Sequence, residues 1–350
     1  MKQKHFNEIV TLHRGYDLPS DDREEGTYPL FSSNGLTDYI SSFKIKGPGV
    51  VTGRSGTIGN VFYSNDDFWP LNTTLYVSDF HGNNPKYIQY WLSSFPLKNF
   101  ASGASVPTLN RNELIGVFCK VHSLNEQQHI VDTIGSVDDL MEKNTKIITK
   151  LSFLTEKTIE LVPRKSTLKP LSYFCYSIIC GTTPSTKNSQ FWMGNIPFIT
   201  LEDISDLPFV TSSQRKISEK CFIKCNRQLH EGDIITSCIG TVGKVALVSC
   251  DCQTNQQINA VNPIPKYRYY LYEELKKKKA ELLLLSKSGS ATPNINKNTF
   301  SNICFAIPND CELDKINSAL SLIFKKILVL QKENDTLRKQ KNVLLAKYFG

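Results

Sequence analysis

Cysteines and carboxylates are the side chains most able to do chemistry in this 350-residue chain, and few of them have the spacing of a known site. Cys221 with Cys225, and Cys250 with Cys252, are in principle four thiolate ligands for a metal ion. Their spacings differ from the usual zinc pattern, and the N-terminal half of the chain has no such set. We therefore expect no metal site and treat the cysteines as reduced thiols.

Two further patterns imitate catalytic motifs. The tetrapeptide NPIP at Asn262–Pro265 resembles the start of an adenine methyltransferase loop, but it lacks the final aromatic residue and a nearby glycine-rich cofactor strand. Asp251 with Glu274 and Lys276 has the spacing of a nuclease triad, which arises by chance among this many acids and lysines. The sequence contains no G-x-x-x-x-G-K-[ST], G-x-S-x-G or H-E-x-x-H motif. It predicts a protein that is not itself an enzyme.

Cations and amides suited to nucleic-acid binding cluster near glycine-rich turns. Lys and Arg neutralise phosphates, Arg also offers a bidentate fork to guanine, and Asn and Gln pair with adenine. Each such side chain, taken alone, is better explained as a solvated surface group. The predicted DNA-contacting residues are Lys44, Lys46, Arg54, Asn72, Lys187, Arg215, Lys216, Lys244, Gln256 and Gln257.

The positive charge is unevenly distributed. The net charge is +8. Residues 1–165 contain 17 basic and 18 acidic side chains, whereas residues 166–350 contain 24 basic and 15 acidic ones. This balance is compatible with a polyanionic partner, with most of the excess in the second half.

The segments that must position these residues occur twice. SGASVPTLNRN at Ser102–Asn112 returns as SGSATPNINKN at Ser288–Asn298. TGRSGTIGNV at Thr52–Val61 returns, with almost the same offset, as TSCIGTVGKV at Thr236–Val245. A period of roughly 185 positions is too long for a solenoid and fits two copies of one domain of ordinary size.

The first repeated segment predicts a scaffold loop. Gly103 and Gly289 permit a tight backbone, and Pro107 and Pro293 stiffen an extended stretch. The asparagines that follow are typical of turns capped by a side chain. We expect each loop to lead into the last strand of its domain.

Each copy continues into a long helical pattern after a region of short predicted strands and turns. Apolar residues alternate in steps of three and four, which is a coiled-coil seam, with Asn144 and Asn334 expected to set the register. The two helices are expected to pack antiparallel. From Glu126 to Lys157 the rise is about 48 Å, enough to hold two domains over neighbouring turns of one duplex. The predicted seam is Ile130, Ile134, Val137, Met141, Asn144, Ile148, Leu151, Ile316, Leu320, Ile323, Ile327, Leu330, Asn334, Leu337 and Leu344.

No apolar run in the sequence approaches the length that a membrane-spanning helix needs, and the first residues contain no apolar core of signal-peptide length. We therefore expect a cytoplasmic protein without a membrane span. The predicted domains are residues 1–122, a spacer helix at 123–165, a second domain at 166–309 and a second spacer helix at 310–350.

The ordered motifs resemble one family, the specificity subunits of type I restriction–modification systems. The matching segments are GTIGNV and GTVGKV, the two SG…P..N.N loops, LNEQQHIVDTIGSVDDLMEKN from Leu124, the C-terminal LRKQKNVLLAKYFG, and GTTPST at Gly181–Thr186. The first copy has RGYDLPSDDREEG where this opening is expected. The resemblance implies an α+β fold of two similar globular target-recognition domains related by a pseudo-two-fold and separated by two long antiparallel coiled-coil helices.

The resemblance also implies a function. Each domain would recognise one half of a split DNA target, and the helices would set the gap and bind two methyltransferase subunits. A motor-nuclease subunit would complete the restriction enzyme. S-adenosylmethionine and ATP would then bind the partners, with no cofactor on this chain. Two alternatives stay open: a stand-alone nuclease or methyltransferase, and a coiled-coil scaffold without a nucleic-acid role.

Overall fold

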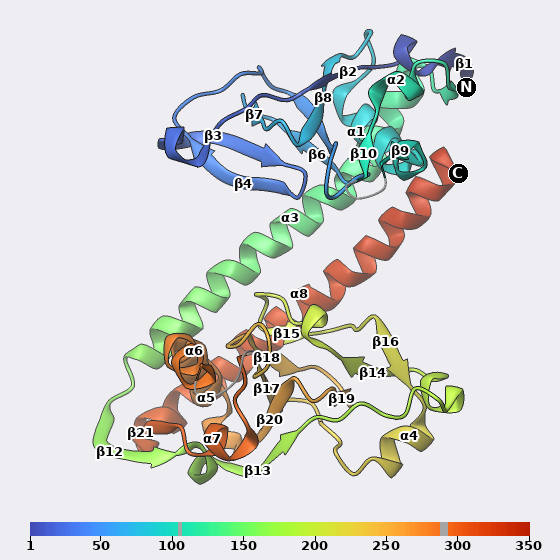
Figure 1. Ribbon diagram of the computed structural model, residues 1–350. Helices are drawn as coiled ribbons and strands as arrows, with labels where there is room; N and C mark the ends of the chain where they lie inside the picture. The colour runs from blue at the N-terminus through green and yellow to red at the C-terminus, as the bar shows by residue number, and fades with distance from the viewer. Residues whose placement is uncertain (104–106, 288–292) are drawn as a thin grey trace. The chain divides into compact units, whose positions relative to one another are not determined.

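The computed structural model describes residues 1–103, 107–287 and 293–350 (Figure 1). The chain divides into two compact units, Met1–Leu140 with Arg338–Gly350, and Met141–Leu337. The predicted tight-backbone position Gly289 lies outside the described residues. Within those residues, no helix combines the length and apolar character needed to cross a membrane.

The first unit is built around a four-stranded antiparallel sheet in the order β2-β8-β5-β6. A smaller sheet, β4-β3-β7, contains an antiparallel and a parallel pair. Helix α1 (Pro85–Ser94) covers the larger sheet, because Ile88 and Leu92 are fully buried against Val50 and Leu75. The strands are β2 (Thr11–Arg14), β3 (Glu25–Ser32), β4 (Gly35–Ile40), β5 (Gly49–Gly53), β6 (Val61–Ser64), β7 (Trp69–Pro70) and β8 (Thr74–Asp79).

The second unit repeats this plan. Its larger sheet has the order β13-β20-β17-β18, extended by β15, and its smaller sheet has the order β16-β14-β19. Helix α5 (Arg268–Lys277) takes the place of α1 and buries Tyr270, Leu271 and Leu275. The strands are β13 (Cys175–Cys180), β14 (Ile196–Ile199), β15 (Phe209–Val210), β16 (Arg215–Ile217), β17 (Ile234–Ser237), β18 (Val245–Val248), β19 (Gln253–Thr254) and β20 (Ile258–Pro263). The prediction of two similar α+β domains is confirmed.

Each domain closes by pairing its first strand with its last. Strand β1 (Lys2–His5) pairs with β11 (Phe118–Val121), and β12 (Arg164–Pro170) pairs with β21 (Cys304–Pro308). The repeated loop leads into β11 and β21, as predicted. The other short elements are β9 (Ala101–Ser102), β10 (Thr108–Leu109), α2 (Arg111–Leu114), α4 (Glu219–Lys224), α6 (Lys279–Ser286), α7 (Lys297–Ser301) and the 3-10 turns η1 (Phe6–Glu8), η2 (Ser20–Asp22), η3 (Leu97–Phe100), η4 (Leu171–Phe174), η5 (Ser189–Trp192), η6 (Leu201–Asp203) and η7 (Pro265–Tyr267).

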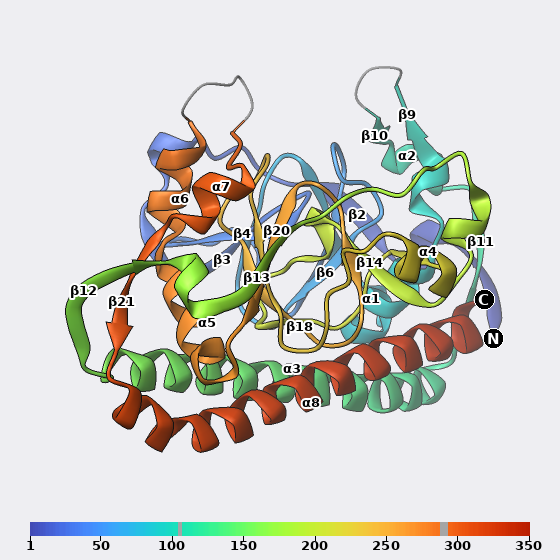
Figure 2. The same cartoon turned by 90° about the horizontal axis from the view of Figure 1, so that it is seen from below.

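Two long helices, α3 (Leu124–Glu160) and α8 (Asp310–Phe349), contribute to both units (Figures 1 and 2). In the first unit the ring of His129 meets that of Tyr348, and Lys341 Nζ lies 2.6 Å from Asp138 Oδ1. Partner numbers fall along α8 as they rise along α3, so the helices run antiparallel there, as expected.

In the second unit the same helices meet through an asparagine pair. Asn144 Nδ2 donates to Asn334 Oδ1 at 3.0 Å and to Glu333 Oε2 at 3.0 Å. Asn334 Nδ2 donates to Met141 O at 3.2 Å and to Thr145 Oγ1 at 3.3 Å. Both asparagines are buried, so the two amides form a polar layer within an apolar interface.

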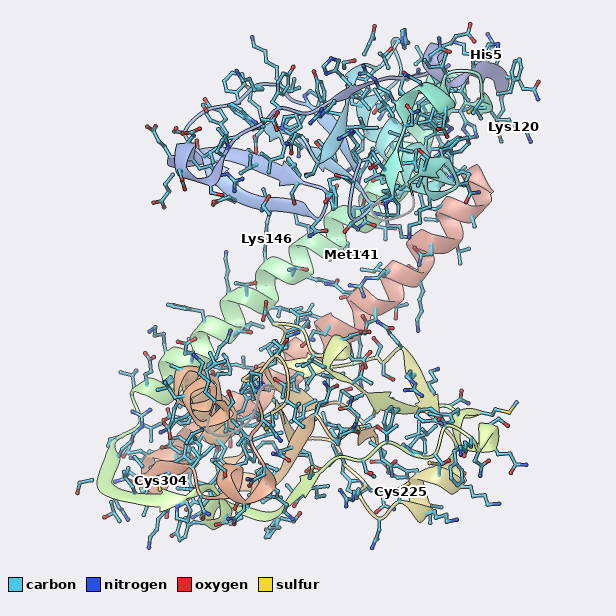
Figure 3. The ribbon with its side chains drawn as sticks, in the orientation of Figure 1. His5, Lys120, Met141, Lys146, Cys225 and Cys304 are labelled. Carbon is cyan, nitrogen blue, oxygen red and sulfur yellow. The ribbon has the colours of Figure 1, made fainter. Side chains whose placement is uncertain are left out.

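The predicted seam residues are all at least half-buried. The buried ones are Ile130, Ile134, Asn144, Ile148, Leu320, Ile327, Leu330, Asn334 and Leu337, and the half-buried ones are Val137, Met141, Leu151, Ile316, Ile323 and Leu344. Figure 3 labels Lys146, which lies outside the seam, is exposed and pairs with Glu142 one turn earlier on α3.

Candidate nucleic-acid interface

The two repeated motifs of the first domain are hydrogen-bonded to each other. We name Gly56–Gly59 and Gly240–Gly243 the Gly turns, and Pro107–Asn112 and Pro293–Asn298 the paired loops. The Leu109 N–H of the paired loop donates to Arg54 O at 2.8 Å, just before the Gly turn. An isolated β-bridge joins Ser55 to Thr108 beside this bond.

The second domain makes the same contacts at the equivalent positions. The Ile295 N–H donates to Cys238 O at 2.9 Å, and a bridge joins Ile239 to Asn294. Segments far apart in the sequence therefore meet in one loop cluster in each copy. The loop asparagines Asn110 and Asn296 cap α2 and α7 by accepting backbone N–H bonds, as predicted for turn-capping side chains.

The Gly turns need glycine at both ends. Gly56 and Gly59 have φ of +82° and +91°, and Gly240 and Gly243 have +77° and +90°. Glycine adopts this left-handed region without the steric cost of a Cβ atom. The motif G-T-[IV]-G is therefore explained by backbone conformation.

The openings of the two domains are also equivalent. Gly15 N donates to Thr74 O at 3.1 Å, and Gly181 N donates to Ile258 O at 3.0 Å. A Cβ atom on Gly15 would lie 2.2 Å from Leu71 O, and one on Gly181 would lie 2.0 Å from Asn255 O. The segment RGYD of the first copy thus corresponds to CGTT of the second, at the place where the sequence led us to expect the opening of the first domain.

Two positions after each opening glycine, a polar side chain contacts an amide from the loop before β8 or β20. Asn72 Nδ2 donates to Asp17 Oδ1 in the first domain. Thr183 Oγ1 donates to Gln256 Oε1 at 2.7 Å in the second domain. The same position therefore carries a polar pair in both domains. The loop amide donates in the first domain and accepts in the second.

Three arginines line one pocket of about 360 Å³ in the first domain. Arg54 Nη1 donates to Asn72 O at 3.5 Å, and Arg111 Nη1 donates to Leu12 O at 3.1 Å, while Arg14 is exposed. Among the described residues the lining also contains Ser102, Thr108, Asn110 and Asn112, and no carboxylate. Uncompensated guanidinium groups in one hollow favour a polyanion such as a phosphate backbone.

Sequence reasoning identified Arg54 and missed Arg14 and Arg111. Arg111 carried a signal, since Lys297 is a cation at the equivalent place in the second paired loop. Arg14 carried no such signal, because it reaches the pocket through the pairing of β2 with β8.

The second domain has no arginine at the positions that correspond to Arg14 and Arg54. Cys180 and Cys238 stand at the positions of Arg14 and Arg54. Burial raises the pKa of the Cys238 thiol to about 12, so this side chain is uncharged at neutral pH. In the second domain, the predicted cations Lys187, Arg215 and Lys216 are exposed, and they lie on segments other than the Gly turn and the paired loop. The two domains therefore present different charges on a common frame.

The remaining predicted residues are placed as follows. Lys244 is half-buried and donates to Ile204 O at 2.7 Å, so its ammonium group has a structural partner. Gln257 Oε1 accepts from Asn255 Nδ2 at 2.9 Å within the loop cluster. Lys44 lies 5.0 Å from the centre of the Trp69 ring, and Lys46 is exposed nearby.

A lysine stem covers the second glycine of each Gly turn, a feature that sequence reasoning missed. A Cβ on Gly59 would lie 3.1 Å from Lys98 Cγ, and one on Gly243 would lie 2.9 Å from Lys279 Cγ. Both lysines are exposed and come from different elements, η3 and α6. No shared motif marks them in the sequence.

The apparent catalytic patterns have structural partners. Asp251 pairs with His230 at 2.9 Å, while Glu274 pairs with Arg164 at 2.8 Å. Asn262 of NPIP lies in β20 and donates to Asp233 Oδ1, just before β17, at 2.8 Å. In the described part of the chain, no group of three or more His, Cys, Asp or Glu side chains is arranged to hold a metal ion. Figure 3 shows Cys304 well away from Cys225 in the second unit.

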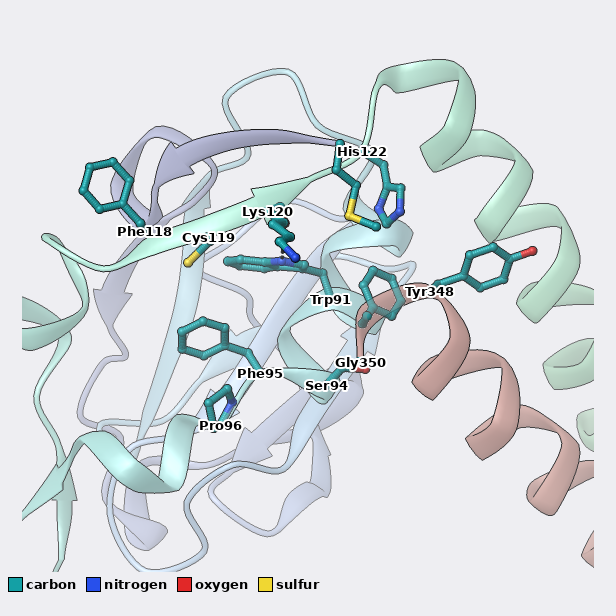
Figure 4. A pocket seen from close by; sticks show the side chains of 12 residues that line it. Trp91, Ser94, Phe95, Pro96, Phe118, Cys119, Lys120, His122, Tyr348 and Gly350 are labelled. Atoms are coloured by element: carbon teal, nitrogen blue, oxygen red, sulfur yellow. Dashed lines mark hydrogen bonds between the residues drawn. The ribbon is translucent and has the colours of Figure 1, made fainter.

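A further pocket, of about 260 Å³, lies against β11 and the end of α8 in the first unit (Figure 4). Trp91 and Phe95 form its apolar wall, with Lys120 and His122 at its edge. His122 Nδ1 is 2.9 Å from the Tyr87 hydroxyl, and burial lowers the pKa of this histidine. The histidine thus has a structural partner, and the loop cluster is the stronger candidate site.

Comparison with known proteins agrees with the duplicated architecture. The family model of the type I restriction modification DNA specificity domain matches residues 1–152 and again residues 166–339. The HindI specificity subunit of Haemophilus influenzae is 33% identical over 190 residues, or 53% of this chain and 41% of that protein. The MjaIX specificity subunit of Methanocaldococcus jannaschii is 30% identical over 176 residues, or 48% and 40%. The matched segments thus span less than half of each relative.

The fold has a solved counterpart. A type I restriction–modification S subunit from M. genitalium superposes with a TM-score of 0.64 at 15% identity, covering 100% of this chain and 96% of that one. At this identity the likeness concerns the fold alone. Because the family model covers both copies and most of the chain, this protein belongs to the family of type I restriction modification DNA specificity domains.

Proposed function

We propose that this chain is the DNA sequence-recognition subunit of a type I restriction–modification complex, with each domain contacting one half of a split target. The observation that carries the proposal is the repeated loop cluster. In both domains the same hydrogen bond joins the paired loop to the residue two positions before the Gly turn. The cluster carries three arginines in the first domain, and Lys297 with the amides Gln256 and Gln257 in the second.

The side chains of the cluster match what DNA recognition requires. Guanidinium and ammonium groups neutralise phosphates and position the protein, while amides and forked guanidinium groups contact base edges. In the first domain Arg14 and Arg54 supply the charge, and Asn72 supplies an amide beside them. In the second domain Gln256 and Gln257 are the corresponding amides, and Lys187, Arg215 and Lys216 would supply charge from exposed segments outside the cluster.

Methyltransferase subunits would dock on the outer faces of the long helices. On α8, Leu322, Val329 and Val343 are 69%, 58% and 67% exposed and recur at multiples of seven positions. On α3, Leu140 and Leu154 are 38% and 48% exposed, with Ile147 half-buried midway between them. Apolar side chains at heptad spacing on a surface suit a partner helix.

The chemistry would reside on the partners. S-adenosylmethionine would bind the methyltransferase subunits and ATP a motor-nuclease subunit, so this chain would need no cofactor. This chain would position the complex on its target sequence. The target adenine could then be extruded from the base stack into a partner's active site.

The test is methylation sequencing of DNA treated with the chain assembled with its methyltransferase subunit and S-adenosylmethionine. Modified adenines should fall in one bipartite motif with a constant gap. A continuous motif, or methylation without sequence preference, would contradict the proposal.

Two separate controls test the alternatives. Purified chain with DNA, magnesium and S-adenosylmethionine should give neither cleavage nor methylation, whereas turnover would indicate a stand-alone enzyme. A gel shift with random duplex at low salt should show weak binding, and its absence would favour a scaffold without a nucleic-acid role.

A further inference from the structure

Arg215 of the second domain is held in an unusually defined position for an exposed arginine. It is the first residue of β16, and its backbone carbonyl accepts a 2.6 Å hydrogen bond from the Ser213 hydroxyl. Its guanidinium carbon lies 3.8 Å from the centre of the Trp192 ring. Among the described residues, Arg215 forms no ion pair with a carboxylate. The charge is therefore oriented without being neutralised.

The Trp192 ring is itself fixed on two sides. Its Nε1 donates to Ser185 O at 3.2 Å, and its ring meets Phe198 edge-on with centroids 5.1 Å apart. Phe198 is fully buried and lies opposite Arg215 across the β14–β16 pair. A guanidinium stacked on an anchored indole loses little conformational entropy when it binds a ligand.

This stack is joined to the loop cluster of its domain. Ser185, which accepts the indole bond, belongs to the opening loop that also contains Thr183. Thr183 Oγ1 donates to the side chain of Gln256, one of the amides proposed to contact DNA. Arg215 therefore lies on a continuous set of contacts that ends at the proposed interface.

The equivalent position of the first domain carries the opposite charge. Leu30 of β3 lies opposite Asp38 on one side and Trp69 on the other. In the second domain Phe198 of β14 lies opposite Arg215 and Gln253 in the same arrangement. The two domains share this strand pairing but carry Arg215 in one and Asp38 in the other. The fold therefore does not require a particular charge at this position.

We infer that Arg215 is a specificity-determining residue that recognises a guanine in the half-site of the second domain. This inference rests on the proposed function and extends it to one residue. A guanidinium offers two parallel N–H donors to guanine O6 and N7 in the major groove, a pattern that no other base presents. Because Arg215 is exposed and its guanidinium contacts Trp192 through the ring, its N–H groups are available to a ligand. Lysine has no such fork, although it carries the same charge.

The experiment compares the wild type with Arg215→Ala, Arg215→Lys and Lys216→Ala, each assembled with the methyltransferase subunit. Methylation sequencing gives the motif, and competition binding to duplexes with each base pair in turn gives the discrimination. Both Arg215 variants should lose roughly 5-fold to 150-fold discrimination at one guanine of one half-site, with the other positions unchanged. Lys216→Ala removes the neighbouring cation from the opposite face of β16, so it should weaken binding without changing the motif.

An unchanged motif in both Arg215 variants would overturn the inference while leaving the proposed function intact. A wild-type complex without a bipartite motif would instead overturn the proposed function. If Arg215→Ala does not accumulate, Arg215→Lys decides alone, because it keeps the charge and part of the packing over Trp192. A purely structural role would lower the melting temperature of Arg215→Lys without altering base preference.

Discussion

Two glycines, Gly15 and Gly181, directly follow the equivalent strands β2 and β13 of the two domains. Both lie so close to a neighbouring backbone carbonyl that any side chain would displace it. Each also donates its N–H across the same pair of strands. The loops that follow them carry the polar groups of the proposed interface, so these glycines position the site without touching a ligand.

Replacing Gly181 with alanine should lower the free energy of unfolding by about 1–3 kcal/mol, because the new methyl group would lie 2.0 Å from Asn255 O. Gly116→Ala is the matched control, since an added Cβ there meets nothing within 4 Å. Urea denaturation of both variants measures the difference. Equal stabilities would show that the close approach at Gly181 is relieved at no cost.

The arginine pocket of the first domain predicts a change in salt dependence. The double variant Arg14→Gln, Arg54→Gln should bind every duplex more weakly. The plot of log K against log salt has a negative slope, and this slope should become less steep by about 0.9 for each phosphate that is no longer neutralised. Lys120→Ala, an exposed lysine on β11, is the control and should keep the wild-type slope. A slope unchanged in the double variant would place the phosphates elsewhere.

Helix α5 is attached to α3 through a buried carboxylate. Glu273 is 1% exposed, accepts a 2.9 Å hydrogen bond from the Thr155 hydroxyl and lies 2.8 Å from Lys276 Nζ. Burial raises the pKa of Glu273 above its ordinary value of 4.5, although Lys276 opposes this shift. The folded chain therefore holds this proton at a pH where the unfolded chain has released it.

This difference predicts how stability changes with pH. From pH 4.5 up to the raised pKa of Glu273, the folded state binds more protons, so the contribution of this group to stability falls as pH rises. Relative to Glu273→Gln, which cannot titrate, the wild type should thus lose stability between pH 4.5 and pH 7. Urea denaturation across this range measures the difference, and parallel profiles would refute it. Lys276→Met should steepen the loss, because it removes the compensating charge.

The polar layer between α3 and α8 should couple the two helices. Asn144→Leu leaves the carbonyl oxygen of Asn334 without its 3.0 Å donor in a buried position, which should cost about 1–3 kcal/mol. The double variant Asn144→Leu, Asn334→Leu should recover most of this loss through apolar packing. A double-mutant cycle from denaturation curves gives the coupling energy. Asn342→Leu, at an exposed position of α8, is the control, and additive effects would mean that the pair does not couple.

For the whole molecule, the proposed function predicts that two weak contacts act together. A duplex with both half-sites at the native gap should bind the assembled complex at least about 10-fold more tightly than a duplex with one, since the second contact becomes intramolecular. Lengthening the gap by about five base pairs turns one half-site to the opposite side of the helix and should remove this gain. Equal affinities for all three duplexes would contradict bipartite binding.

The duplication, the α+β class and the two long helices could all be predicted from the order of residues along the chain. Those features depend on local requirements that recur in each copy. Glycine is needed where φ is positive, asparagine where a short helix begins, and apolar residues at heptad spacing where a helix is covered. Such requirements act over short stretches of backbone, so their pattern is visible in the chain.

Which segments meet could be learned only from the folded molecule. Arg14 joins Arg54 and Arg111 because β2 pairs with β8, and Asn144 meets Asn334 because the helices pack in one register. The sequence matched Gly15 and Gly181 only loosely, as the openings of the two copies, since the residues around them differ, and the strand pairing shows that the two positions are equivalent. These contacts join positions far apart in the chain, and the pairing and register that create them leave no periodic mark in the sequence.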